Sequence, residues 1–380
     1  MTAAEAAQAV PVANGTEQPA TSGEAAATMD ISAYLKLLVQ KKGSDLFFTA
    51  GAPVKIKLEG KIYSAGKSVL TPELSIAAAY GIMNDTQRAE FAENLECDFA
   101  ISMPDGSARF RVNVFRQRGD VGMVLRLIPS EIPTIEDLNV PEVLKDLIGA
   151  KRGLLLMVGA TGSGKSTTLA AMINHRNGTM AGHILTIEDP VEFFHPNRMS
   201  IVNQREVGVD TKSYARALKA SLREAPDVIL IGEIRDRTTM EAALELANTG
   251  HLAISTMHAN NANQAMERVV NMFPQELHKQ LYMDLSLNLR AVVAQRLVPD
   301  VCGKRCAAVE ILVATPHIQA LILKGEIEAL KEAMTNSGAK GMQTFDMSLY
   351  NLYQENRITL EEALNNADSR TNLEAKINFG

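Results

Sequence analysis

A glycine-rich stretch, GATGSGKST, spans residues 159–167 and matches the pattern G-x4-G-K-[S/T] through Gly159, Gly164, Lys165 and Ser166. An apolar run precedes it and a helical pattern follows, which is the context that a phosphate-binding loop requires. Glycines let successive backbone N–H groups face phosphate oxygens, and the helix N-terminus adds positive partial charge. The lysine should reach the outer phosphates, and the serine hydroxyl should ligate Mg²⁺. The residues expected to contact a nucleoside triphosphate here are Gly159, Ala160, Thr161, Gly162, Ser163, Gly164, Lys165, Ser166 and Thr167.

Two further apolar runs end in acidic residues. The stretch DVILIGEIRD carries Glu233 just after an apolar run, and TIEDPVE holds Glu188, Asp189 and Glu192. Ligands of parallel sheets bind at the carboxyl ends of the strands, so these acids should lie near the phosphate loop. We expect Glu233 to hold the Mg²⁺ shell through water, Glu188 to contact the nucleotide, and the acids of TIEDPVE to orient and deprotonate an attacking water.

A fourth apolar run has a histidine at each end. In TGHLAISTMHANN, His251 and His258 flank the predicted strand at residues 252–256. A histidine near the γ-phosphate can donate a hydrogen bond and so respond to whether that phosphate is present. A lone histidine is more often structural, and the residues alone leave both roles open.

The chain that must position these residues divides into segments of different pattern. Residues 1–28 are rich in Ala, Thr, Gly and Pro and have no Lys or Arg, which predicts a disordered tail. Residues 29–130 begin with a helix that should end at Gly43, and strands such as 54–58 then alternate apolar and polar side chains. This pattern predicts a small α+β domain with a mostly antiparallel sheet.

A proline-containing segment at residues 131–140 is predicted to be a linker, and residues 141–380 form a second domain. Short, continuous apolar runs alternate there with helical segments, which indicates a parallel sheet covered by helices on both faces. Beyond Thr315 the pattern is helical, and Thr315 and Thr359 are plausible helix starts. The predicted fold class is therefore α/β for this domain, with a helical part at its carboxyl end.

Composition argues against two classes of protein. The net charge of −6 speaks against a nucleic-acid partner, because phosphate neutralisation needs a basic surface. Only 5% of the residues are aromatic and none is Trp, so few side chains could stack on the bases of single-stranded DNA. This argues against a DNA translocase. No run of about 18 apolar residues is present, so no transmembrane helix is expected.

The motifs together are more specific than any one alone. GATGSGKS, TIEDPVE, VILIGEIRD and TGHLAISTMHANN resemble the Walker A, Asp box, Walker B and His box of secretion-superfamily ATPases. The stretches GSDLFFTAGAPVKIKLEGKI and GMQTFDMSLYNLYQENRITLEEAL extend the likeness to the PilT/PilU family of type IV pilus retraction ATPases, most of all its PilU branch. The resemblance covers roughly residues 29–370.

This resemblance implies a PAS-like domain followed by a RecA-like P-loop ATPase domain, assembled as a homo-hexamer that hydrolyses ATP with Mg²⁺ for pilus retraction and twitching motility. It implies that Glu192 is the catalytic glutamate and Glu233 the Walker B glutamate, and it raises the expectation for His251 and His258. It also implies arginine fingers from the first domain, for which Arg109, Arg111 and Arg126 are the candidates. The implied partners are a PilT-like retraction ATPase and a PilC-like platform protein of the inner membrane. The implied location is cytoplasmic, at the inner face of that membrane.

Two departures from the family pattern matter. The chain has HIQALILKG where PilT-like sequences carry an AIR-type motif tied to retraction, which keeps open an accessory ring subunit that binds ATP but hydrolyses it weakly. It also lacks the paired C-x-x-C ligands of assembly ATPases, which argues against an assembly or type II secretion motor. A small-molecule kinase would need an acceptor pocket and lid for which the sequence gives no sign.

Overall fold

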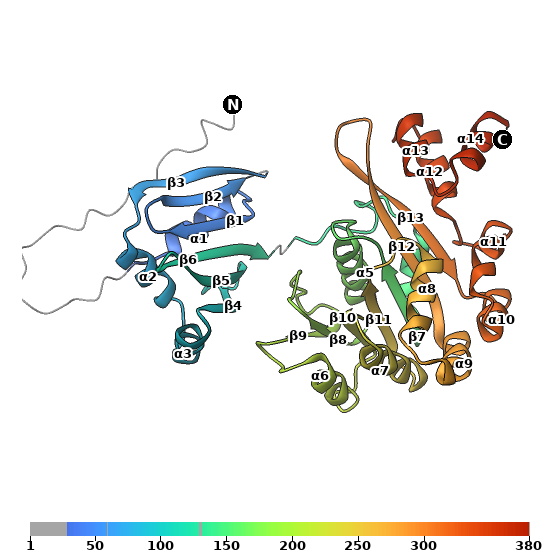
Figure 1. The fold of residues 1–380 in the computed structure, drawn as a ribbon, viewed down its shortest axis with the longest axis horizontal. Coiled ribbons are helices and arrows are strands. Elements are labelled where there is room, and N and C mark those ends of the chain that lie inside the picture. The colour runs from blue at the N-terminus through green and yellow to red at the C-terminus, as the bar shows by residue number, and fades with distance from the viewer. Residues whose placement is uncertain (1–28, 59, 129–130, 380) are drawn as a thin grey trace, which may run out of the picture. The chain divides into compact units, whose positions relative to one another are not determined.

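The computed structural model describes residues 29–58, 60–128 and 131–379, and the chain divides into two compact units between residues 130 and 131 (Figure 1). The predicted tail at residues 1–28 lies outside the described residues. Each unit has its own hydrophobic core.

In its described residues the amino-terminal unit is an antiparallel six-stranded sheet with three helices, as the alternating pattern predicted. Its strand order is β3-β2-β1-β6-β5-β4. Its elements are α1 (Ser32–Gln40), β1 (Asp45–Thr49), β2 (Pro53–Leu58), β3 (Lys61–Val69), α2 (Pro72–Tyr80), α3 (Asp85–Asn94), β4 (Glu96–Ser102), β5 (Arg109–Gln117) and β6 (Asp120–Ile128).

Alternation along the strands separates a core face from a polar face. On β5 the side chains of Phe110, Val112 and Val114 are fully buried, and Arg109 and Arg111 lie on the other face, as predicted.

Helix α1 ends at Gln40, and Lys42 rather than Gly43 takes the left-handed conformation that follows the helix. Lys42 takes the left-handed conformation, with φ of 51°, and Gly43 N–H donates to the Leu38 carbonyl at 2.9 Å, as in a Schellman cap. Gly43 is needed for space instead. A Cβ at this position would lie 2.7 Å from a Leu38 methyl carbon and 2.9 Å from one of Leu58.

The carboxyl-terminal unit contains a seven-stranded sheet in the order β13-β12-β7-β11-β10-β8-β9. All neighbouring pairs are parallel except β12 and β13, which form an antiparallel hairpin at one edge. The strands are β7 (Gly153–Val158), β8 (Gly182–Glu188), β9 (Ser200–Glu206), β10 (Val228–Glu233), β11 (Leu252–Met257), β12 (Leu289–Pro299) and β13 (Arg305–Val313). The sequence analysis predicted β7, β8, β10 and β11 and did not predict β9, β12 or β13.

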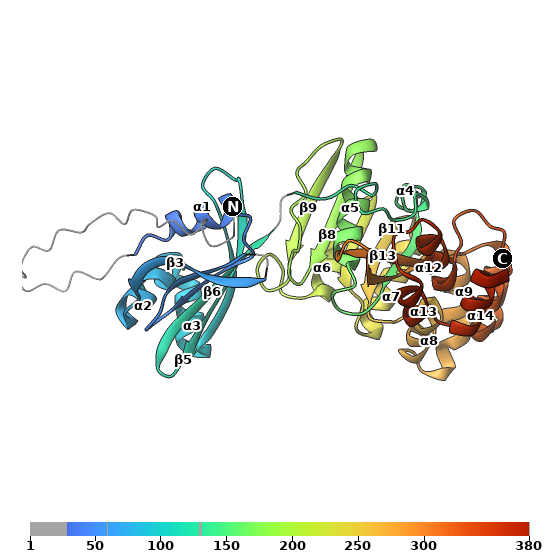
Figure 2. The ribbon, with the colours of Figure 1, turned by 90° about the horizontal axis from the view of Figure 1, so that it is seen from above.

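Helices cover both faces of this sheet, as expected for a doubly wound fold. They are α4 (Val143–Ile148), α5 (Lys165–Thr179), α6 (Tyr214–Ser221), α7 (Arg237–Asn248), α8 (Ala262–Asn271), α9 (His278–Asn288), α10 (Pro316–Lys324), α11 (Leu330–Thr335), α12 (Phe345–Gln354), α13 (Leu360–Asn366) and α14 (Arg370–Phe379), with short 3₁₀ turns at Gln275–Leu277 and Ile327–Ala329. On β7, Leu155 and Met157 pack with α4 and α5, and Leu154 and Leu156 pack in the core with α7, α8 and α9. Figure 2 shows α12, α13 and α14 lying together near the carboxyl terminus.

Two details refine the sequence analysis. The predicted helix starts are confirmed, because Thr315 and Thr359 cap α10 and α13 through their side chains. Part of the predicted linker is integral to the second unit, since Ile135 and Val140 are buried in its core. No helix in the described ranges is both long and apolar enough to cross a membrane.

Candidate functional site

The phosphate loop joins β7 to α5 in a conformation that only glycine tolerates well. Gly159, Gly162 and Gly164 have φ of 154°, 77° and 84°. A Cβ on Gly159 would lie 2.5 Å from Ser163 Oγ, and one on Gly164 would lie 2.7 Å from Gln295 Nε2. The loop is therefore shaped by both backbone conformation and close packing.

Lys165 begins α5 and is buried, with 9% of its surface exposed. Its ammonium group donates to the carbonyls of Gly159 and Ala160 at 2.8 Å each. Burial lowers the pKa of Lys165, and the charges of Glu233 and Glu192 oppose that shift. The lysine is thus held against the loop and electrostatically coupled to both predicted acids.

A side chain that the sequence analysis missed, Gln295 of β12, fixes the loop to the sheet. Its Nε2 donates to the Ser163 carbonyl at 2.9 Å, and its Oε1 accepts from Thr168 Oγ1 at 2.8 Å. Gln295 is 2% exposed. No local motif marks this residue, because β12 is far from the loop in sequence.

Replacing Gln295 by Met should destabilise the carboxyl-terminal unit. The change leaves the buried Ser163 carbonyl and Thr168 hydroxyl without their partner, which costs about 1–3 kcal/mol of unfolding free energy. Urea unfolding of the full chain measures the effect, with Gln280→Met on the exposed surface of α9 as the control. Equal unfolding midpoints for the two variants would contradict the role given to Gln295.

The carboxyl ends of four parallel strands meet beside the loop. Glu233 ends β10, and His258 follows β11. His258 Nε2 lies 3.2 Å from Glu233 Oε1, and Arg235 Nε lies 2.8 Å from Glu233 Oε2. The two residues predicted from separate motifs are thus in direct contact, and an arginine that was not singled out shares the carboxylate.

Glu188 ends β8 and is engaged inside the unit. Its Oε1 accepts from Thr186 Oγ1 at 2.7 Å and from Gln204 Nε2 at 3.3 Å. Burial raises the pKa of Glu188, and these two hydrogen bonds oppose the shift. Glu192 lies four residues further on and is exposed. It has no side-chain hydrogen bond or ion pair to any described residue.

These groups line one cleft of about 480 Å³. Its lining residues are Thr161, Gly162, Gly164, Lys165, Ser166, Thr167, Leu169, Ala170, Glu188, Asp189, Pro190, Glu192, Phe193, His195, Tyr214, Leu230, Gly232, Glu233, Thr256, His258, Leu297 and Arg305. Arg305, at the start of β13, and Tyr214, at the start of α6, were not anticipated. The fold alone brings them to the cleft.

His251 is not among the lining residues. It precedes β11, whereas His258 follows it, so the length of the strand separates the two histidines. His251 Nδ1 instead contacts the Leu246 carbonyl and Thr249 Oγ1, both at 3.1 Å. The sequence predicted that His251 contacts a nucleotide, but His251 does not line the cleft. It lies at the amino end of β11, whereas the cleft lies at the carboxyl end.

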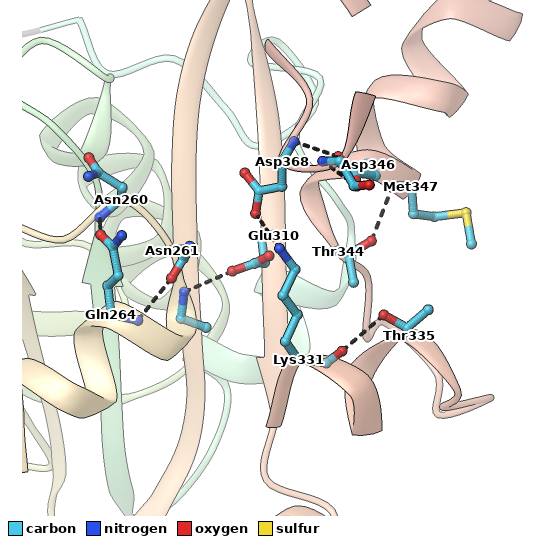
Figure 3. Close-up of polar contacts among 12 residues, drawn as sticks. Asn260, Asn261, Gln264, Glu310, Lys331, Thr335, Thr344, Asp346, Met347 and Asp368 are labelled. Carbon is cyan, nitrogen blue, oxygen red and sulfur yellow. Dashed lines mark hydrogen bonds and ion pairs between the residues drawn. The ribbon is translucent and has the colours of Figure 1, made fainter. Parts of the chain in front are cut away.

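The segment after His258 is held from β13. Ala262 N–H, at the start of α8, donates to Glu310 Oε1 at 2.8 Å. Glu310 is 2% exposed, and burial raises its pKa. Figure 3 shows Glu310 lying between Asn261 and Lys331. The backbone that follows His258 is thus anchored by a buried carboxylate that does not line the cleft.

Arg296 of β12 adds a second anchor. Its Nη2 donates to the Asn260 carbonyl at 3.3 Å and to Asp368 Oδ1 at 2.7 Å. The guanidinium carbon lies 3.9 Å from the centre of the Phe345 ring. Lys331 also pairs with Asp368, at 3.1 Å. Through Arg296 the carboxyl-terminal helices contact the same segment that follows His258.

The three candidate arginine fingers all lie on the sheet of the amino-terminal unit. Arg126 Nε donates to the buried Asp45 at 2.8 Å, and Arg111 lies 3.8 Å from Asp98. Within the described ranges Arg109 has no side-chain partner. Arg109 is therefore the least engaged guanidinium of the three.

The donor set fits a magnesium nucleotide. Gly164 precedes α5 without a side-chain cap, so the first N–H groups of α5 keep no intrahelical partner. Ser163 Oγ is buried without a hydrogen-bond partner among the described residues. Uncapped N–H groups, a buried ammonium and the Ser166 hydroxyl suit phosphate oxygens, and the oxygens of Ser166 and Glu233 suit Mg²⁺.

Comparison with known proteins places this geometry in context. The family described as Type II/IV secretion system protein matches residues 21–373. The type IV pilus ATPase PilU of Pseudomonas aeruginosa is 54% identical to the chain over 93% of its residues and 92% of the relative's length. The type IV pilus retraction ATPase PilT of the same organism is 44% identical over 88% and 97%. A crystal structure of the pilus retraction motor PilT with bound ADP superposes with a TM-score of 0.84 at 40% identity, covering 91% of this chain and 99% of the other.

Proposed function

The chain belongs to the Type II/IV secretion system protein family, in its branch of type IV pilus retraction ATPases, and from this premise we propose that it is a hexameric motor that drives pilus retraction and twitching motility. It is an ATPase with a PAS-like domain followed by a RecA-like P-loop domain. The observation that carries the proposal is the meeting of Lys165, Glu192, Glu233 and His258 in one cleft at the carboxyl ends of parallel strands.

In this proposal each side chain has one task. Glu192, whose carboxylate is not engaged elsewhere, accepts the proton of the attacking water. Lys165 balances charge on the outer phosphates, and Ser166 with Glu233 would hold Mg²⁺, which would neutralise further phosphate charge. His258 is the side chain that responds to the γ-phosphate, because it shares Glu233 with the metal site.

A neighbouring subunit supplies the arginine. We assign this role first to Arg109, because Arg126 is bound to a buried carboxylate and Arg111 is close to Asp98. An arginine finger contributes about 10³ to 10⁵ in rate. Such a contact requires a neighbouring subunit, and we propose a homo-hexamer because the resemblance to the retraction ATPases implies one.

The proposed partners follow from the relatives. We propose a PilT-like retraction ATPase as a paralogue that acts with this chain, and a PilC-like platform protein as the element it turns. The proposed location is the cytoplasmic face of the inner membrane. We propose no nucleic-acid partner, since the chain carries a net charge of −6.

One observation favours a second candidate, an accessory ring subunit with weak hydrolysis. Arg235 lies 2.8 Å from Glu233, so the carboxylate must give up this contact to serve Mg²⁺ fully. Phosphate release by the purified chain separates the candidates. The accessory subunit would be favoured if the wild-type chain released phosphate at a rate near the buffer background and Glu192→Gln did not lower that rate.

Pilus retraction in living cells tests the main proposal. Cells lacking the chain should lose retraction force, with and without the PilT-like paralogue, and the wild-type chain should restore what was lost. Pilus number serves as the control, because a retraction defect leaves more pili on the surface. Unchanged retraction in both backgrounds would contradict a motor function.

A further inference from the structure

The turn that follows β8 and carries Glu192 is held by side chains of the edge strand β9. Gln204 and Glu206 are two residues apart on β9, so they point to the same face of the sheet. Both contact the backbone of this turn, which comprises residues 189–195. We call this pair the β9 clasp.

The clasp fixes the turn on both sides of Glu192. Gln204 Oε1 accepts from His195 N–H at 2.8 Å, and Gln204 Nε2 donates to the Phe193 carbonyl at 2.8 Å. On the other side, Val191 N–H donates to Glu206 Oε2 at 3.1 Å. Backbone groups at residues 191, 193 and 195 are therefore anchored, and the residue between the first two is Glu192.

The same amide also reaches the base of the turn. Gln204 Nε2 donates to Glu188 Oε1 at 3.3 Å, and Thr186 Oγ1 donates to that oxygen at 2.7 Å. Thr186 lies opposite Gln204 in the parallel register of β8 and β9. One glutamine side chain therefore contacts Glu188 at the end of β8 and two backbone groups of the turn, at Phe193 and His195.

Gln204 is half-buried, and the groups around it are buried. Val191 and His195 are 2% and 5% exposed, and Glu206 is 5% exposed. Anchors that are shielded from water hold their hydrogen bonds against competition from solvent. The clasp therefore holds the backbone on both sides of Glu192, whereas the Glu192 side chain is exposed and lines the cleft.

We propose that Gln204 is a positioning residue for hydrolysis, with Glu206 as its support, and that it acts by setting the place of the Glu192 carboxylate above the phosphate loop. The inference rests on the proposed role of Glu192. It predicts an effect on turnover without an effect on nucleotide binding, because the clasp touches none of the phosphate-loop residues.

The test is Gln204→Met in the full-length chain, which keeps side-chain length and removes both hydrogen-bonding ends. We expect kcat for ATP hydrolysis to fall about tenfold to a hundredfold, since displacement of a reacting group by about 1 Å costs that much. KM for ATP and affinity for a fluorescent ADP analogue should change less than about twofold, because Gln204 contacts no residue of the phosphate loop. Asn203→Ala is the matched control. Asn203 is the neighbouring exposed residue of β9, which contacts His183, and it should leave kcat unchanged.

A double-mutant cycle with Glu192→Gln decides whether the effect passes through Glu192. Adding Gln204→Met to Glu192→Gln should reduce turnover less than about twofold further, because coupled residues are not additive. The proposal would be overturned if Gln204→Met lowered turnover by the same factor in the Glu192→Gln background as in the wild-type chain. It would also be overturned if Gln204→Met lowered the affinity for ADP as much as it lowered kcat. If Glu192→Gln alone keeps wild-type turnover, the assigned base is wrong, and that failure is seen without any Gln204 variant.

Thermal unfolding of each variant checks the fold. Should Gln204→Met not fold, Gln204→Glu retains the acceptor for His195 N–H and removes the donor to the Phe193 carbonyl. It should show the same kcat loss at unchanged KM. Wild-type kcat in folded Gln204→Glu would overturn the proposal.

Discussion

Lys165→Ala is expected to lose most of its affinity for ATP. The side chain is buried at the start of α5, and its ammonium group is held over the phosphate loop by two carbonyls. Removing a charged hydrogen-bond donor of this kind costs about 1.5–3 kcal/mol, which corresponds to roughly a tenfold to more than hundredfold weaker affinity. Titration with a fluorescent ATP analogue measures the loss directly.

The matched control is Lys279→Ala, on the exposed surface of α9. It removes the same charge from the same unit, so any effect of net charge alone appears in both variants. If Lys165→Ala keeps wild-type affinity and turnover, the nucleotide does not bind at this loop, and the proposed site is wrong.

Glu192→Gln is expected to keep ATP bound and to stall its hydrolysis. The amide is nearly isosteric with the carboxylate but cannot accept a proton from water. Loss of a general base lowers kcat by about 10² to 10⁴. Phosphate release by the purified chain gives kcat, and the ATP analogue titration shows whether binding is intact.

Glu245→Gln on the exposed face of α7 is the control for this substitution. The nearest alternative base is Glu188, and the two carboxylates differ in their surroundings. Glu188 is half-buried, with a raised pKa and two hydrogen bonds to one oxygen, whereas Glu192 is exposed. Full turnover in Glu192→Gln would transfer the role to Glu188.

Local patterns in the sequence were sufficient for much of the fold. Alternation predicted the antiparallel sheet of the first unit, and continuous apolar runs predicted β7, β8, β10 and β11. These patterns are readable because burial on one or both faces of a strand is imposed residue by residue. The threonine caps of α10 and α13 are equally local, since each is a contact within three residues.

The strands that the sequence analysis missed lie at the sheet edges or pair across long separations. β9 mixes buried and polar side chains, and β12 pairs with β7, which lies more than a hundred residues earlier. Gln295 on β12 and Gln204 on β9 were missed for the same reason. Their function as anchors exists only when distant strands are placed side by side.

The sequence by itself determined the phosphate loop, the acids at the ends of predicted strands and the family, because each depends on residue types at fixed local spacing. The tertiary structure decided which of those residues share a cleft. It brought Glu233 and His258 into contact and left His251 at the opposite end of β11. The physical reason is that a β-strand is extended. His251 and His258 lie at its two ends, so they are separated by the full length of the strand although they are only seven residues apart in sequence.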